Sequence, residues 1–237
     1  MIEVKNVKKS YRSKHVLKDI SFSVNEGDIC ALIGVNGAGK STLVESICSI
    51  RQVDDGQIFV DKVLVNDKKN KKVLNMTIGY MSQFFGLFGD LTVRENLEYF
   101  GAIYKISDGR VDEIIKLCYL NDYEKALSKN LSGGYKQLLS LAVAIIHSPK
   151  VLILDEPTSN MDPLFRKNFW TIIKKLNKTG VTILLITHFI EELLECKTMM
   201  CLSSGKIVYS GEVKDFKKDG FINIEDILKK FGGVDNG

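Results

Sequence analysis

A glycine-rich segment that ends in Lys-Ser-Thr could hold the phosphates of a nucleotide. It matches the pattern G-x-x-x-x-G-K-[ST]. In this pattern backbone N–H groups bind phosphate oxygens, and the N-terminus of the following helix adds partial positive charge. Lys40 can then reach the β- and γ-phosphates, and the Ser41 hydroxyl can ligate Mg²⁺. The alternative is an ordinary glycine turn before a helix. The segment consists of Gly34, Val35, Asn36, Gly37, Ala38, Gly39, Lys40, Ser41 and Thr42.

Two adjacent carboxylates could supply a metal ligand and a general base. Asp155 and Glu156 end the apolar run that begins at Val151, and such a run is typical of a central parallel strand buried on both faces. Ligands of open α/β sheets lie at the carboxyl ends of such strands. We expect Asp155 to hold Mg²⁺ and Glu156 to take a proton from an attacking water. The alternative is a pair of solvated acids.

Other candidate residues each have a structural alternative. His188 follows the strand-like run from Val181 to Ile186, so it could contact a γ-phosphate or be structural. Gln83 ends another predicted strand. Tyr11 could stack on adenine or pack on a sheet edge. The segment Leu131-Ser132-Gly133-Gly134 precedes an apolar helix, and its small residues suit either an anion site or an ordinary N-cap at Ser132.

Hydrophobic periodicity predicts the strands that must position these residues. Alternation at residues 2–7 and 20–24 predicts half-buried antiparallel strands, and a hairpin is predicted around Asp61-Lys62. The continuous apolar runs at 29–33 and 151–155 predict buried parallel strands. The chain should therefore combine a mainly parallel sheet with a small antiparallel subdomain.

The stretch between residues 84 and 148 predicts helices and no strand. Thr92-Val93-Arg94-Glu95 is a capping box that opens the first helix. A second helix begins near Ser107, and a short third covers Leu120 to Leu127. The apolar helix from Tyr135 to about His147 completes an inserted helical subdomain.

Composition narrows the class of protein. The 237 residues, 45% of them hydrophobic and 26% charged, suit a globular α/β chain. The net charge of +4 is mild, and the lysine-rich run at 67–72 favours a solvated loop over a nucleic-acid surface. The five cysteines have no C-x-x-C spacing, so we expect reduced thiols. No apolar stretch is long enough to span a bilayer, and residues 1–5 lack a signal region.

The order of these motifs resembles that of the ATP-binding cassette (ABC) ATPases. The resemblance extends over about residues 2–212, and Leu131–Gly134 matches the signature that separates this family from other P-loop enzymes. It implies an α/β fold: a P-loop NTPase core with a mainly parallel sheet, an N-terminal antiparallel β-subdomain and an inserted helical subdomain. The implied divisions are a core at 1–83 and 149–211, a helical signature subdomain at 84–148 and a short helical tail at 212–237.

The resemblance also assigns roles. Residues 34–42 become Walker A, and Asp155 and Glu156 close Walker B. The other implied roles are a contact to Mg²⁺ or the lytic water for Gln83, the switch histidine for His188, the adenine-stacking ring for Tyr11, and the D-loop for Ser159–Asp162. Asp162 also looks like the N-cap of a helix that has Pro163 at its first position. Tyr135 departs from the family pattern, which often has Gln at this place.

The implied function is ATP hydrolysis that drives a membrane partner. One P-loop and one signature per chain imply a homodimer or heterodimer of cassettes, in which each signature contacts ATP held by the other chain. The permease would be a separate polypeptide, and the chain would lie on the cytoplasmic side of the cell membrane. The implied cofactors are ATP and Mg²⁺, and nucleic acid is not an expected partner.

The branch of the family is indicated by two weaker resemblances. Gly89–Leu97 and Ile224–Leu228 resemble segments of drug- and antibiotic-exporter cassettes. The segment from Phe84 to Phe88 is either a loop packed on the core or an exposed patch for a partner. Alternatives to the transporter are an ABC ATPase that acts as a soluble clamp or assembly factor, and a nucleotide-binding regulator without turnover.

Overall fold

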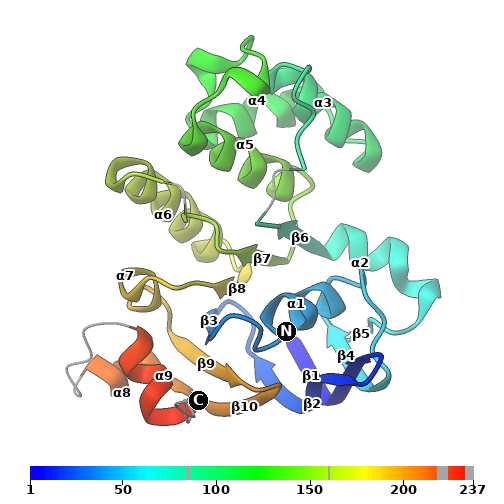
Figure 1. Ribbon diagram of the computed structural model, residues 1–237. Helices are drawn as coiled ribbons and strands as arrows, with labels where there is room; N and C mark the ends of the chain where they lie inside the picture. Colours follow the sequence, from blue (N-terminus) through cyan, green and yellow to red (C-terminus); the bar gives the residue numbers. More distant parts are fainter. Residues whose placement is uncertain (84–85, 160, 218–223, 233–237) are drawn as a thin grey trace.

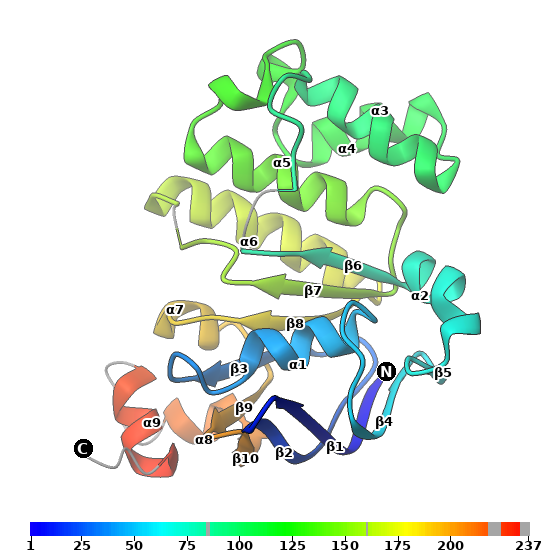
Figure 2. The same ribbon diagram turned by 45° about the vertical axis from the view of Figure 1, so that its right-hand side comes forward.

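A six-stranded sheet forms the centre of the computed structural model, which describes residues 1–83, 86–159, 161–217 and 224–232. Its strands are β3 (Ile29–Gly34), β6 (Ile78–Met81), β7 (Val151–Asp155), β8 (Thr182–Ile186), β9 (Thr198–Ser203) and β10 (Lys206–Glu212). The order is β10-β9-β3-β8-β7-β6, and only β10 pairs in the antiparallel sense. Figure 2 shows the arrowheads of β6, β7, β8 and β3 pointing the same way. Their carboxyl ends therefore meet at one edge, as the apolar runs predict.

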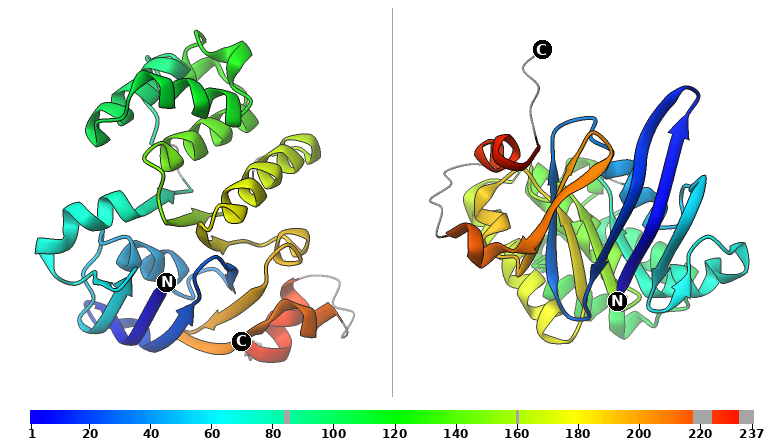
Figure 3. Two further views of the ribbon diagram at one scale, coloured as in Figure 1. Left: turned by 180° about the vertical axis from the view of Figure 1, so that it is seen from behind. Right: turned by 90° about the horizontal axis from the view of Figure 1, so that it is seen from below.

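A second sheet is antiparallel throughout. It is built from β1 (Ile2–Tyr11), β2 (Lys14–Val24), β4 (Asp55–Val60) and β5 (Val63–Leu64). The order is β2-β1-β4-β5. Seen from below, the long β1–β2 hairpin lies beside β10 (Figure 3), where the Lys18 N–H donates to Gly205 O at 2.8 Å. The predicted N-terminal strands and the hairpin at Asp61-Lys62 are thus confirmed.

The helices follow the strands in an α/β arrangement. Their bounds are α1 (Lys40–Ile47), α2 (Lys71–Thr77), α3 (Val93–Tyr104), α4 (Asp108–Leu117), α5 (Gly133–Ile145), α6 (Pro163–Lys178), α7 (Ile190–Leu193), α8 (Val213–Lys217) and α9 (Ile224–Gly232). Between β6 and β7 the chain forms α3, α4 and α5, which lie together above the sheet in Figure 1. This is the inserted helical subdomain. The capping box at Thr92 and the Asp162 cap are both present.

Each face of the parallel sheet contributes to a different hydrophobic core. Leu152 and Leu154 of β7 pack in a core with apolar residues of α3 to α6. Val151 and Ile153 pack in a second core with α1 and the antiparallel sheet. Because neighbouring strand residues point to opposite faces, this alternation places Asp155 on the α1 side of the sheet.

Two expectations about secondary structure were wrong. The run at 67–72 is not a plain solvated loop: Asp67 accepts a hydrogen bond from the Lys69 N–H, and α2 begins at Lys71. Residues 120–127 form no α-helix. Their carbonyl groups instead pair with the start of α3, since the Val93 and Arg94 N–H groups donate to Ala126 O and Glu124 O, both at 3.0 Å.

Within the described ranges, no helix is both long and apolar enough to cross a bilayer.

Gly79 lies where α5 crosses β6 most closely. A Cβ atom there would be 2.2 Å from Ala144 O and 2.8 Å from the Pro149 ring. We expect Gly79→Ala to lower the free energy of unfolding by about 1–3 kcal/mol, because two backbones would have to separate. Gly109→Ala in α4 is the matched control, since nothing lies within 4 Å of a Cβ there. Denaturant unfolding measures both variants. Equal stabilities of the two variants would contradict the close packing.

Candidate nucleotide-binding and catalytic site

The loop between β3 and α1 has the backbone of a phosphate-binding turn. Gly37 and Gly39 have φ values of 78° and 109°, a left-handed region that favours glycine. Gly39 is the N-cap of α1 and makes no side-chain cap, so the first N–H groups of this helix are not occupied by a capping side chain. A Cβ at Gly39 would lie 3.0 Å from Val16 O, so β2 closes one side of the turn. This geometry suits an anion at the helix N-terminus.

Lys40 lies beneath this turn. Its side chain is largely enclosed, with 7% of the residue exposed, and Nζ donates to Gly34 O at 2.8 Å and Val35 O at 3.2 Å. Burial lowers its pKa, and the nearby Glu156 and Asp155 carboxylates act against that shift. The next residue, Ser41, is exposed. The Lys40 amine and the Ser41 hydroxyl thus lie on the same turn of α1.

Asp155 is the buried acid of the site. It is 6% exposed, and burial raises its pKa to about 6, helped by the negative charge of Glu156 and opposed by Lys40. A carboxylate that is costly to ionise without a counter-charge gains most from a cation. Asp155 on the α1 side would therefore suit a cation, and Ser41 is the second candidate ligand.

Glu156 is held by both neighbouring strand ends. Its φ is +50°, and its N–H donates to Ile186 O at 3.0 Å. The carboxylate contacts His188 Nε2 through one oxygen and accepts from Gln83 Nε2 at 3.2 Å through the other. The structure thus brings together Gln83, Glu156 and His188 from the ends of β6, β7 and β8. The hydrogen bond to Ile186 holds the chain in this strained turn.

The signature segment does not join this cluster. Ser132 is the N-cap of α5 but makes no side-chain cap hydrogen bond, and Leu131 is buried. A Cβ at Gly134 would lie 2.6 Å from the Phe165 ring, so the start of α5 packs tightly on α6. Gly133 begins the helix. The N-terminus of α5 is therefore positioned by α6, and in the described part of the chain no hydrogen bond joins residues 131–134 to residues 34–42.

Tyr135, the departure from the family pattern, packs in an aromatic cluster. Its ring centroid is 3.9 Å from that of Tyr123 and 4.8 Å from that of Phe165. Tyr135 thus contributes to the packing between the helical subdomain and α6.

Asp162 has a clear local role. Its carboxylate accepts hydrogen bonds from the Leu164 and Phe165 N–H groups at 2.9 and 3.0 Å, which caps α6. Of the predicted D-loop, residue 160 lies outside the described residues, as do Phe84 and Phe85 of the segment after Gln83.

Tyr11 stands at the exposed end of the β1–β2 hairpin and is 38% exposed. Lys9 Nζ and the Arg51 guanidinium each lie 5.6 Å from its ring centroid. Tyr11 does not line the hollow beside the P-loop described next. Adenine stacking therefore stays a prediction.

A hollow of about 560 Å³ opens beside the P-loop. It is lined by Gly34, Val35, Asn36 and His188, and by Ile224, Glu225 and Leu228 of α9. Sequence reasoning treated residues 212–237 only as a tail and missed that α9 lies against the phosphate-binding turn. The amphipathic pattern of 224–228 predicts a buried helix face, but no local signal identifies the surface that it covers.

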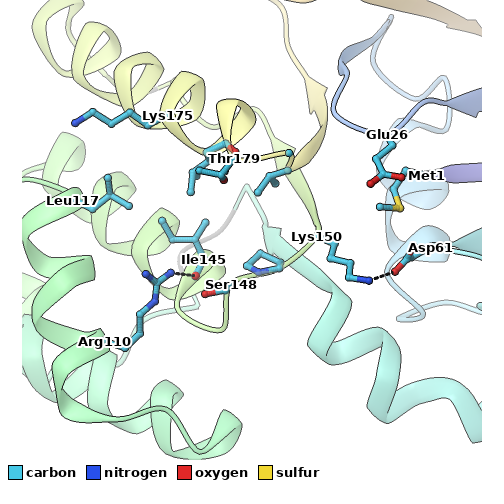
Figure 4. Close-up of a pocket in the computed structure, with 14 residues that line it drawn as sticks. Met1, Glu26, Asp61, Arg110, Leu117, Ile145, Ser148, Lys150, Lys175 and Thr179 are labelled. Carbon is cyan, nitrogen blue, oxygen red and sulfur yellow. Dashed lines mark hydrogen bonds and ion pairs between the residues drawn. The ribbon is translucent and has the colours of Figure 1, made fainter.

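A second hollow, of about 610 Å³, lies far from this chemistry. Lys150 and Val181 line it, and these residues immediately precede β7 and β8, so it opens at the amino ends of the strands. In Figure 4, Arg110 reaches toward Ile145 and Lys150 faces Asp61 at 2.6 Å. Because ligands of such sheets lie at the carboxyl ends, this hollow is not the nucleotide site.

The raised pKa of Asp155 predicts that the folding stability of the metal-free protein depends on pH. Between its ordinary pKa and about 6 the folded chain holds a proton that the unfolded chain has released, so this group reduces stability as pH rises through that window. We expect Asp155→Asn to be more stable than wild type by roughly 1–3 kcal/mol at about pH 7.5, with the difference vanishing below about pH 4.

Denaturant unfolding in chelator across this pH range measures the effect. Asp122→Asn, at an exposed position, serves as the control, and we expect it to be no more stable than wild type. An Asp155→Asn variant that is less stable than wild type at about pH 7.5 would contradict the account.

Comparisons with known proteins agree with this geometry. A family model described as ABC transporter matches residues 17–159. The chain is 34% identical over 221 residues to the probable multidrug ABC transporter ATP-binding protein YbhF of Escherichia coli strain K12. The matched region covers 92% of this chain and 38% of YbhF. The chain is 35% identical over 227 residues to the methionine import ATP-binding protein MetN 1 of Staphylococcus aureus strain N315, covering 91% of this chain and 67% of MetN 1.

A solved structure shares the fold. It is described as the dimeric structure of a post-hydrolysis state of the ATP-binding cassette MJ0796 bound to ADP and Pi. The two chains align with a TM-score of 0.83 and 27% sequence identity, over 90% of this chain and 99% of the other. The family model alone spans more than half of the chain. This chain therefore belongs to the ABC transporter family, as an ATP-binding cassette with a P-loop NTPase fold.

Proposed function

We propose that this chain binds and hydrolyses ATP to power a separate transmembrane permease, and that the transporter is an exporter. The observation that carries the proposal is the Glu156 carboxylate held between Gln83 and His188 at the sheet edge that also bears the P-loop. A carboxylate so placed can accept a proton from water that attacks a γ-phosphate. Glu156 is the proposed base, and His188 and Gln83 orient it and the water.

The site residues fit ATP and Mg²⁺. Residues 34–42 would hold the phosphates through backbone N–H groups and Lys40, and Tyr11 would stack on the adenine. Ser41, Gln83 and Asp155 would hold Mg²⁺, which usually keeps few protein ligands and shares phosphate oxygens. Bound at these residues, Mg²⁺ would neutralise phosphate charge during hydrolysis.

The catalytic unit is proposed to be a dimer. The N-terminus of α5 packs on α6 and does not line the hollow beside the P-loop of the same chain. Leu131, Ser132, Gly133 and Gly134 would therefore meet ATP held by a second cassette, identical or different, with the loop at Asp162 facing the same interface. MJ0796 is itself described as dimeric.

An exposed apolar surface supports a permease partner. Val73 and Met76 of α2 and Tyr99 and Ile103 of α3 are all more than two-fifths exposed, and so is Phe88. In Figures 1 and 2, α2 and α3 lie on the same side of the molecule. Clusters of exposed large apolar side chains mark interaction sites. Docking there would hold the chain on the cytoplasmic side of the membrane.

The direction of transport rests on the two segment resemblances and on YbhF, which is described as a probable multidrug protein. MetN 1 is described as an import protein, so general similarity does not decide direction. The soluble clamp or assembly factor is the less favoured alternative, because the similar proteins are described as a multidrug ABC transporter protein and a methionine import protein. We further propose the domain boundaries given above, namely 1–83 with 149–211, 84–148, and 212–237.

Replacing the proposed base tests hydrolysis directly. We expect Glu156→Gln to lower steady-state phosphate release by about 10²-fold or more, with nucleotide affinity retained, because the amide cannot accept the proton. The matched control is Glu113→Gln on α4, at the surface of the helical subdomain. Near-normal turnover in Glu156→Gln would exclude Glu156 as the base, and an inactive wild-type protein would exclude an ATPase.

The permease proposal predicts membrane association through α3. In its own cells, the tagged chain should sediment with the membrane fraction, and Tyr99→Ser with Ile103→Ser should release it. Purified double variant should keep its basal ATPase rate. Val208→Ser on β10 removes a comparably exposed apolar residue elsewhere and should stay in the membrane fraction. Undiminished sedimentation of the double variant would contradict docking on this surface.

A further inference from the structure

A buried carboxylate lies directly behind the catalytic cluster. Glu192 of α7 is 1% exposed. One carboxylate oxygen accepts a hydrogen bond from the Thr158 hydroxyl, and the other accepts one from the Thr187 hydroxyl. Thr158 and Thr187 are 0% and 1% exposed. Burying a carboxylate is costly unless hydrogen bonds compensate, and these two bonds to a charged acceptor are of the strong kind.

The two hydroxyl groups belong to the two loops that carry the catalytic residues. Thr158 follows Glu156 by two positions, in the turn where Thr158 O accepts from the Met161 N–H at 3.0 Å. Thr187 immediately precedes His188, and its hydroxyl also accepts from the Phe189 N–H at 3.0 Å. Two contacts therefore fix the Thr187 hydroxyl, one to the Glu192 carboxylate and one to the Phe189 N–H.

These contacts close a ring. On the open side of the sheet edge, the side chains of Glu156 and His188 contact each other. On the buried side, Glu192 ties together the backbone segments that carry them. Because each loop lacks regular secondary structure at this point, the orientation of both catalytic side chains depends on such ties.

We propose that Glu192 is a positioning residue for hydrolysis, which links the loop from Glu156 to Asp162 with the switch histidine His188. The inference rests on the proposed ATPase function. In a dimer the loop at Asp162 would face the partner cassette, so Glu192 would pass changes in that loop to His188. Glu192 is buried and acts through Thr158 and Thr187.

The first test replaces the carboxylate by its amide. An amide offers one acceptor oxygen in place of two, so one hydroxyl loses its acceptor. We expect Glu192→Gln to lower kcat by about 10- to 100-fold, while KM for ATP changes less than about 3-fold. Glu191→Gln is the matched control, since the neighbouring side chain is exposed and the charge change is the same. It should match wild type.

Two substitutions of Thr158 test whether its hydroxyl group is required. Thr158→Val should reproduce the loss in kcat, whereas Thr158→Ser keeps the hydroxyl and should restore most of it. In a His188→Ala background the effect of Glu192→Gln should become smaller, because His188 is one of the two side chains that Glu192 positions. A folded Glu192→Gln with kcat within about 3-fold of wild type, or an undiminished effect without His188, would overturn the proposal.

A readout without hydrolysis separates this proposal from the ATPase proposal. The chain has 3 histidines, so ring resonances can be assigned by substitution. Glu192→Gln should shift and broaden the His188 ring resonances in the nucleotide-free protein and leave those of His15 unchanged. Unchanged His188 resonances would overturn the positioning role even in an active enzyme. If wild type proves inactive, a shifted His188 resonance would still support the positioning role while the ATPase proposal fails.

Discussion

The site depends on one hydrogen bond at the end of β7, from the Glu156 N–H to Ile186 O. This bond keeps Glu156 attached to the neighbouring strand while its positive φ turns the chain out of the sheet. Asp155, the last residue of β7, faces α1 and Lys40, and Glu156 faces His188 and Gln83. Two consecutive acids can therefore do different chemistry: one is buried and suited to a cation, the other is reachable by water.

The buried surroundings of this turn explain why it can be strained. β7 is enclosed on both faces by the two cores, so its end cannot shift without disturbing either core. Behind the turn, Glu192 holds Thr158 and Thr187, and in front α1 holds Lys40 under the P-loop. The candidate catalytic edge is thus held by β7, α7 and α1, which are distant in the sequence.

Much of this arrangement could be predicted from the sequence. Several features are local patterns with a direct physical interpretation: the P-loop, the apolar run before Asp155, the cap at Asp162 and the capping box at Thr92. The sequence did not reveal Glu192, because Thr158, Thr187 and Glu192 have no distinctive spacing and meet only through tertiary packing. It also missed α2, a short helix in which Leu74 is the one buried apolar side chain, and the absence of an α-helix at 120–127, whose carbonyl groups bond to α3 instead.

The central claim is that the P-loop and the signature of one chain serve different nucleotide sites. Mixing two inactive variants tests it most directly: Lys40→Ala disables the P-loop, and Ser132→Arg disables the signature. A mixed dimer then contains one site with an intact P-loop from one chain and an intact signature from the other. The account predicts that phosphate release, absent in each variant alone, returns on mixing. A mixture that stays as inactive as its components would contradict the account.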